Sequence, residues 1–283
     1  MPGKHIFATL VVLVLAFSNC FSQEQILYKQ IDTTKLYMEL HQPEKIDTTK
    51  KYPAIAFFFG GGWHGGSIKQ FERQANYFAR RGMVCFLVDY RVKKRQHTTP
   101  FESLKDAKSA LRFIRQHAEE FHIDTSKIVA SGGSAGGHLA AATALIEDYN
   151  ESTDDLSVNC RPNALVLFNP VIDNGPGGYG YERIGDEYKN FSPLHNIKKG
   201  TPPTIFFLGT KDVLIPVETA EYYKVVMEKV KSRCELRLYE GAGHGFFNYR
   251  NFEYYKQTVS EADKFLQSLG YLKNDPVIKI EYQ

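Results

Sequence analysis

One serine, one aspartate and one histidine lie in glycine-containing segments where they could together make a nucleophile. Ser134 is the central residue of GGSAG (132–136), and Asp212 ends GTKD (209–212). His244 lies between two glycines in GAGHG (241–245). A serine hydroxyl attacks an ester only when a base removes its proton and a third group orients that base. The three residues therefore predict a catalytic triad, with Ser134 as nucleophile, His244 as base and Asp212 as its orienting acid.

Each of these residues also has a purely structural interpretation. A glycine-rich turn can simply join a strand to a helix, and Asp212 precedes an expected helix near Pro216 that it could cap. A histidine between glycines is often an ordinary loop residue. All three residues, however, directly follow strand-like runs, and this shared placement favours the catalytic interpretation.

A second glycine-rich segment, GGGW at 60–63, follows another strand-like run. Its backbone amides, with that of Ala135, could stabilise the oxyanion that forms when an ester is attacked. Gly60, Gly62 and Gly65 also fit the G-x-G-x-x-G pattern of dinucleotide-binding loops, with Asp89 ending the next strand. Two observations count against a dinucleotide-binding loop. Trp63 would crowd the pyrophosphate, and such a loop would leave Ser134, Asp212 and His244 without a function.

The elements that must position these residues alternate along the chain. Two alternating segments at 25–31 and 35–41 predict antiparallel strands at a sheet edge. Six apolar runs then predict buried strands, and helical stretches separate most of them, which indicates a mostly parallel sheet covered on both faces. The six runs are 53–59, 83–89, 127–132, 163–169, 203–209 and 234–240.

From about Tyr52 to Leu269 the chain resembles the α/β-hydrolase superfamily, in the esterase branch related to hormone-sensitive lipase and bacterial carbohydrate esterases. The resemblance is carried by GGGW (60–63), DYR (89–91), GGSAGGH (132–138), GTKD (209–212) and GAGHGF (241–246). It implies the α/β-hydrolase fold, the triad above, and an oxyanion hole made by the amides of Gly61, Gly62 and Ala135. The family usually has histidine where this chain has Phe59, which leaves the support of that loop open. His138 matches no catalytic position and is expected to be a packing residue.

The N-terminus predicts export. Lys4 is followed by an apolar stretch from Ile6 to Phe17 that is too short to span a bilayer, so residues 1–22 are expected to be a signal peptide and 23–283 a single α/β-hydrolase domain. A lipid anchor at Cys20 is a less favoured alternative, because Asn19 precedes it. We therefore expect a periplasmic or extracellular protein with no membrane span after the signal is removed.

The cysteines and the composition exclude several classes of protein. Cys85, Cys160 and Cys234 have no C-x-x-C spacing, so a disulfide scaffold or zinc site is not expected; Cys85 should be a packed thiol, and a Cys160–Cys234 bridge stays open. The net charge is only +3, and the one basic cluster, Arg91–Arg95, is expected to be a solvated loop. We expect no nucleic-acid partner, no metal and no cofactor.

The expected substrate is an ester with a short acyl group. No segment long and apolar enough to form a cap over a fatty chain is evident, and the stretch 173–200 predicts a loop or small lid. Trp63, Tyr179 and Tyr181 are candidates for substrate contact, and the tyrosines of this stretch are suited to stacking on sugar rings. The sequence thus favours a secreted acetylesterase acting on polysaccharides or oligosaccharides. A lipase-like carboxylesterase on small or lipid esters, a peptidase or amidase on the same fold, and a non-catalytic binding protein are the alternatives.

Overall fold

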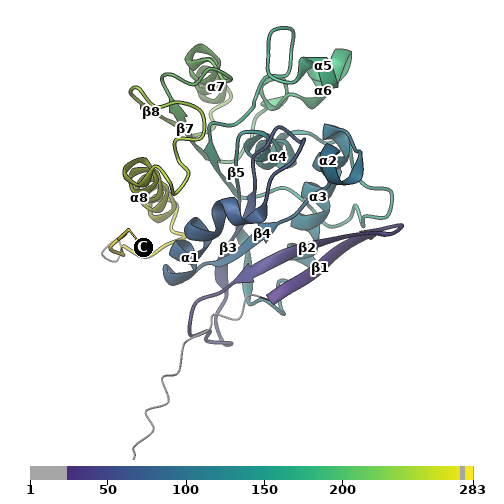
Figure 1. Ribbon diagram of the computed structural model, residues 1–283. Helices are drawn as coiled ribbons and strands as arrows, with labels where there is room; N and C mark the ends of the chain where they lie inside the picture. The colour runs from purple at the N-terminus through teal and green to yellow at the C-terminus, as the bar shows by residue number, and fades with distance from the viewer. Residues whose placement is uncertain (1–23, 275–277, 283) are drawn as a thin grey trace, which may run out of the picture.

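The computed structural model describes residues 24–274 and 278–282 (Figure 1). The predicted signal peptide over residues 1–22, including Cys20, lies outside the described residues. Within them, no helix is long and apolar enough to cross a membrane.

The centre of the fold is an eight-stranded sheet in the order β1-β2-β4-β3-β5-β6-β7-β8 (Figure 1). The pairs β1–β2 and β2–β4 are antiparallel, and all other neighbours are parallel. This confirms the predicted mostly parallel sheet with antiparallel N-terminal edge strands. The strands are β1 (Glu24–Ile31), β2 (Thr34–His41), β3 (Tyr52–Phe58), β4 (Val84–Val88), β5 (Ile123–Gly133), β6 (Ala164–Phe168), β7 (Thr204–Gly209) and β8 (Cys234–Tyr239).

Helices cover both faces of the sheet. Side chains alternate along a strand, so in β3 Ala54 and Phe58 pack into one core cluster while Ile55 and Phe57 pack into the other. Two helices, α1 (Glu72–Arg80, preceded by the short η1, Ile68–Phe71) and α8 (Phe252–Ser268), supply buried side chains to the second cluster. The first cluster takes its side chains from α3 (Pro100–Gln116), α4 (Ala135–Leu145) and α7 (Val217–Lys229).

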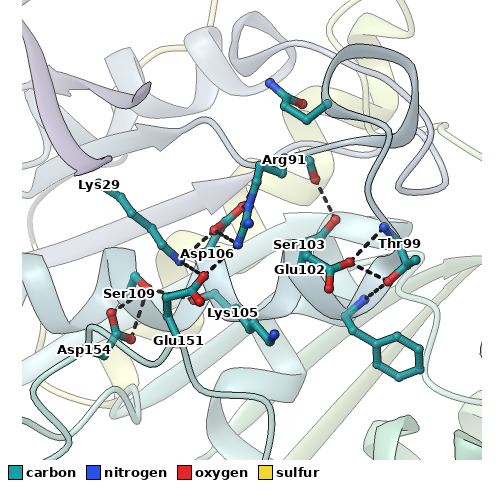
Figure 2. A network of polar contacts seen from close by, with 12 residues as sticks. Lys29, Arg91, Thr99, Glu102, Ser103, Lys105, Asp106, Ser109, Glu151 and Asp154 are labelled. Atoms are coloured by element: carbon teal, nitrogen blue, oxygen red, sulfur yellow. Dashed lines mark hydrogen bonds and ion pairs between the residues drawn. The ribbon is translucent and has the colours of Figure 1, made fainter. Parts of the chain in front are cut away.

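The basic cluster Arg91–Arg95 differs from its prediction. Lys93 and Lys94 are exposed in the short helix α2 (Lys93–Gln96), but Arg91 is buried. Its guanidinium donates to both oxygens of Asp106, each at 2.8 Å, and Figure 2 shows the network around this carboxylate. Arg91 is therefore a structural ion-pair partner, because the fully buried carboxylate from α3 requires charged donors.

The start of α3 lies beside this network and has a complete capping box. The Thr99 hydroxyl accepts from the backbone of the first helical turn, and Glu102 accepts from the Thr99 amide at 2.9 Å (Figure 2). Pro100 occupies the first turn, where its missing N–H costs nothing. The apolar face of this helix packs into the core, with Leu104, Ala107 and Leu111 buried.

The three cysteines of the described residues are free thiols. Cys85 is completely buried in β4, and burial raises the pKa of its thiol, in agreement with the packed thiol expected there. The bridge left open between Cys160 and Cys234 is not formed in the structure.

The stretch 173–200, between β6 and β7, folds into short helical turns and not into an extended loop. None is longer than four residues, so the cap over the sheet is small, as predicted. The turns are α5 (Tyr181–Ile184), η2 (Gly185–Glu187), α6 (Tyr188–Phe191) and η3 (Pro193–Asn196).

Candidate active site

Ser134 occupies a strained turn between β5 and α4. Its φ of 53° and ψ of −120° lie outside the regions that most side chains prefer, so the hydroxyl is held at the carboxyl end of the sheet. The flanking glycines are required by close packing: a Cβ on Gly132 or Gly136 would overlap backbone atoms, including the carbonyl oxygen of Phe58 at the end of β3. The motif G-x-S-x-G is therefore a steric consequence of packing this turn against β3.

Asp212 and His244 reach Ser134 from the ends of the next strands. Asp212 follows β7, and His244 follows β8, in the loops at the same edge of the sheet. His244 Nδ1 lies 2.7 Å from Asp212 Oδ2, and His244 Nε2 lies 2.9 Å from Ser134 Oγ. The three residues predicted from sequence are thus in direct contact with one another.

The carboxylate of Asp212 is fully buried and has partners on both oxygens. Its Oδ1 accepts from the amides of Leu214 at 2.9 Å and Ile215 at 3.0 Å, which leaves Oδ2 for the histidine. These bonds order the loop before α7, whose N-cap residue is Pro216, so Asp212 does not cap that helix. An ionised carboxylate can only accept, so His244 Nδ1 donates to it and Nε2 is free to accept the Ser134 proton.

The loop Gly60–Trp63 provides amides beside Ser134. Gly61, Gly62 and Trp63 have φ values of 135°, 62° and 56°, and Gly60, Gly61 and Gly62 line the same cleft as Ser134. Within the described residues, the amides of Gly61, Gly62 and Ala135 donate no hydrogen bond. Unpaired N–H groups next to a nucleophile are the donor set that an oxyanion requires.

Comparisons with known proteins agree with this arrangement. The BD-FAE family model matches residues 38–176, and the dienelactone hydrolase family model matches residues 166–273. The apo form of Thermogutta terrifontis esterase 2 is 42% identical, with a TM-score of 0.86, over 92% of this chain and 100% of that one. The chain belongs to the α/β-hydrolase superfamily. Within it, the chain is related to the esterase branch that includes hormone-sensitive lipase.

Curated relatives give the same family at lower coverage. Esterase LipC of Mycobacterium tuberculosis is 30% identical over 70% of this chain, and acetylxylan esterase of Xylanibacter ruminicola is 27% identical over 79%. The chain spans 54% of the first and 47% of the second, or about half of each. Further structures of the Thermogutta esterase are described as phosphonylated by sarin, propionate-bound and butyrate-bound.

Phe59 replaces the family's usual histidine, and other residues support the loop Gly60–Trp63, called the oxyanion loop below for its candidate role. The Phe59 carbonyl accepts from the Tyr90 hydroxyl at 2.6 Å, and the two rings stack with centroids 4.1 Å apart. The Gly60 amide donates to Gln70 Oε1 at 2.6 Å, and Arg183 donates to the Gly62 carbonyl. The departure from the family pattern therefore leaves the loop fully supported.

Three carboxamide side chains connect the loops of the site. Gln70 Nε2 donates to Asn248 Oδ1 at 3.0 Å, and Asn248 Nδ2 donates to the Gly245 carbonyl at 2.7 Å. On the other side, the Gly245 amide donates to Asn169 Oδ1 at 3.2 Å, while Asn169 Nδ2 lies 3.4 Å from His244 Nε2. This carboxamide chain joins the end of β6, the histidine loop and the oxyanion loop, and nothing in the sequence pattern marked its members.

Ser134 opens onto a cleft of about 340 Å³. Of the three aromatic residues predicted to contact substrate, only Tyr179 lines it. Trp63 is only 1% exposed and packs in the core against Phe191 and His138, so its predicted substrate contact is wrong. Tyr181 lies outside this cleft. The lining residues are Gly60, Gly61, Gly62, Gln70, Ser134, Asn169, Tyr179, Leu214, His244, Gly245, Phe247, Asn248 and Arg250.

His138 is the packing residue that the sequence predicted. It is fully buried, its ring stacks on Phe191 with centroids 4.4 Å apart, and its Nε2 donates to the Phe191 carbonyl at 3.0 Å. Burial lowers the pKa of His138 to about 3, so the ring is neutral at physiological pH.

Asp89, the acid of the rejected dinucleotide interpretation, is also accounted for. Its two oxygens accept from the Arg95 guanidinium at 2.5 and 2.8 Å, so the carboxylate is engaged in an ion pair.

Proposed function

We propose that the chain is an exported serine esterase that removes short acyl groups, acetyl in particular, from carbohydrate esters. The observation that carries the proposal is the contact of Ser134 with His244 and of His244 with Asp212, at 2.9 and 2.7 Å, beside the unpaired amides of the oxyanion loop. This set of groups supports attack by Ser134 on an ester carbonyl, without a metal or cofactor.

The reaction follows from the positions of these groups. Ser134 Oγ attacks the carbonyl carbon while His244 Nε2 takes its proton, and the amides of Gly61, Gly62 and Ala135 stabilise the oxyanion. His244 then returns the proton to the leaving alcohol, which departs and leaves an acyl group on Ser134. A water molecule, deprotonated by His244, hydrolyses this acyl-enzyme and restores the serine. Asp212 stabilises the imidazolium in both halves of the cycle.

The size and lining of the cleft support a short acyl group. A long chain gains about 0.8 kcal/mol per methylene only where apolar walls bury it. The cleft is lined by backbone and carboxamide groups, with Tyr179, Leu214 and Phe247 as its larger apolar side chains. The propionate-bound and butyrate-bound structures of the Thermogutta relative are consistent with short acyl groups in this branch.

The carbohydrate part of the proposal is supported by the acetylxylan esterase relative and by the Tyr179 side chain at the cleft. Tyrosine rings can stack on sugar rings while the hydroxyl makes hydrogen bonds. Export is proposed from the basic and apolar pattern of the first 22 residues, and cell fractionation of the full chain tests it directly.

Two measurements test the activity. A fluorophosphonate probe should label Ser134, as located by peptide mapping, and labelling should be absent in Ser134→Ala. Among aryl esters with one leaving group, kcat/KM should be highest for acetyl to butyryl. Labelling of another residue, or hydrolysis that is insensitive to the probe, would exclude the proposed mechanism.

A lipase-like carboxylesterase is the second candidate, because Val213 and Leu214 expose apolar side chains in the loop after Asp212, at 89% and 37% exposure. Such a rim would suit a lipophilic ester. A maximum of kcat/KM at eight carbons or more would favour this candidate over the carbohydrate esterase. A matched anilide, hydrolysed as fast as the ester, would instead indicate an amidase.

A further inference from the structure

Arg250 gives the lining of the cleft a positive charge. Among the described residues that line it, only Arg250 and the triad histidine can carry a positive charge, and none is an aspartate or glutamate. Arg250 is exposed, and it has no hydrogen bond or ion pair within the part of the chain that the structure describes. Its guanidinium is therefore available to an anionic group in the cleft.

The backbone that carries Arg250 is held in a defined position. The Asn251 amide donates to the Asn248 carbonyl at 2.8 Å, and the side chains of both asparagines donate to the Gly245 carbonyl, at 3.3 and 2.7 Å. The loop is thus closed on itself between His244 and the start of α8. A fixed backbone reduces the entropy that a binding arginine would otherwise lose.

The chemistry of ester cleavage places Arg250 on one side of the reacting bond. The histidine that takes the Ser134 proton must return it to the leaving oxygen, so the alcohol part of the ester lies on the histidine side of Ser134. Arg250 belongs to the loop that follows His244 and lines the same cleft. Arg250 is therefore available to the alcohol part of the ester.

Two more cations belong to segments that contact the loops of the site. Lys211 is exposed, and its amide donates to the Ala242 carbonyl of the histidine loop. The Arg73 guanidinium lies 4.8 Å from the centre of the Tyr249 ring, next to Arg250 in sequence. The nearest acid along the chain, Glu253, is paired with a lysine of α8 at 2.6 Å.

We propose that Arg250 binds a carboxylate on the alcohol part of the substrate, so that esters of acidic sugars are preferred over esters of neutral sugars. The inference rests on the proposed esterase function and adds a substrate class to it. A guanidinium can engage a carboxylate through two parallel hydrogen bonds, which also orients the substrate.

A matched pair of esters tests this binding. 4-Acetoxybenzoate and its methyl ester share the acetyl group and the aryl leaving group, and differ in the carboxylate. The wild-type ratio of their kcat/KM values, charged over neutral, should fall about fivefold in Arg250→Gln, and further in Arg250→Glu. The loss should appear mainly in KM, since a contact remote from the reacting bond is made equally in the ground and transition states.

Arg80→Gln is the control, because Arg80 is an exposed arginine at the end of α1 that does not line the cleft; it should leave the ratio unchanged. Acetylated methyl glucuronoside and methyl glucoside extend the comparison to sugars. If Arg250→Gln lowers kcat/KM equally for the charged and the neutral ester, or for neither, the carboxylate subsite is excluded while the esterase function stands. If wild type hydrolyses neither ester of either pair, the proposed function fails and this inference fails with it.

Discussion

Replacing Gln70 tests whether the carboxamide chain positions the oxyanion loop. Gln70→Leu removes the acceptor of the Gly60 amide, at 2.6 Å, and the donor to Asn248, at 3.0 Å, with little change in side-chain volume. Leaving a partly buried amide without its acceptor costs about 1–3 kcal/mol. If that cost falls on the transition state, kcat should drop roughly 5- to 150-fold at about 1.4 kcal/mol per tenfold.

The assay is steady-state hydrolysis of an aryl acetate, with kcat and KM determined separately. KM should change little, because an oxyanion donor acts chiefly in the transition state. Asn163→Leu is the matched control. The Asn163 side chain, just before β6, accepts from the Ile128 amide in the middle of β5 at 3.0 Å and does not line the cleft, so its loss should lower the thermal midpoint without lowering kcat. A folded Gln70→Leu protein with wild-type kcat would refute the positioning role.

A double variant of Gln70 and Asn248 tests whether the carboxamide chain couples the oxyanion loop to the histidine loop. If Gln70 and Asn248 act as one unit, the effects of Gln70→Leu and Asn248→Leu on kcat should be clearly less than additive in the double variant. Additive effects would show that the oxyanion loop and the histidine loop are held independently of each other.

Three further predictions concern single side chains. Ser134→Ala should lower kcat by about 10⁴ to 10⁶ with an unchanged thermal midpoint, and wild-type-like turnover would remove Ser134 from the mechanism. Arg183→Met should lower kcat more than it raises KM, because it frees the Gly62 carbonyl; an effect on KM alone would contradict this. His138 has a pKa of about 3 in the folded protein and about 6.5 in the unfolded chain. As the pH falls from about 6.5 toward about 3, only the unfolded chain binds this proton. The free energy of unfolding should therefore decrease by about 1.4 kcal/mol per pH unit in this range. In urea unfolding between about pH 6.5 and 4.5, His138→Gln should lack this component, and parallel pH profiles of the two proteins would disprove it.

The fold and the meeting of Ser134, Asp212 and His244 could be predicted because each leaves a local signal. Buried parallel strands are continuous apolar runs, and residues that follow them lie at one edge of the sheet. The glycines around Ser134 mark a turn that a Cβ would not fit. Both signals are short-range, so one sequence is enough to read them.

The supporting contacts could not be predicted because they join distant segments through side chains without a periodic pattern. Gln70 and Asn248 are 178 residues apart, and neither has a spacing that distinguishes it from other loop carboxamides. Arg91 was misplaced for the same reason, since its partner Asp106 belongs to a helix with an ordinary apolar face. The burial of Trp63 was missed because its packing partners, His138 and Phe191, are distant in sequence.

The small cap and the oxyanion loop are physically connected, which links substrate choice to catalysis. Arg183 of α5 donates to the Gly62 carbonyl, and its guanidinium lies 5.3 Å from the Trp63 ring and 5.2 Å from the Tyr179 ring. The residue that lines the cleft, Tyr179, and the loop that carries the oxyanion donors therefore share one arginine. The Arg183 guanidinium contacts two aromatic rings and a buried carbonyl at once, so it has few alternative positions. Displacement of the cap would therefore also displace the oxyanion loop. Changes in the cap that admit a longer acyl chain should consequently lower kcat even for acetyl esters.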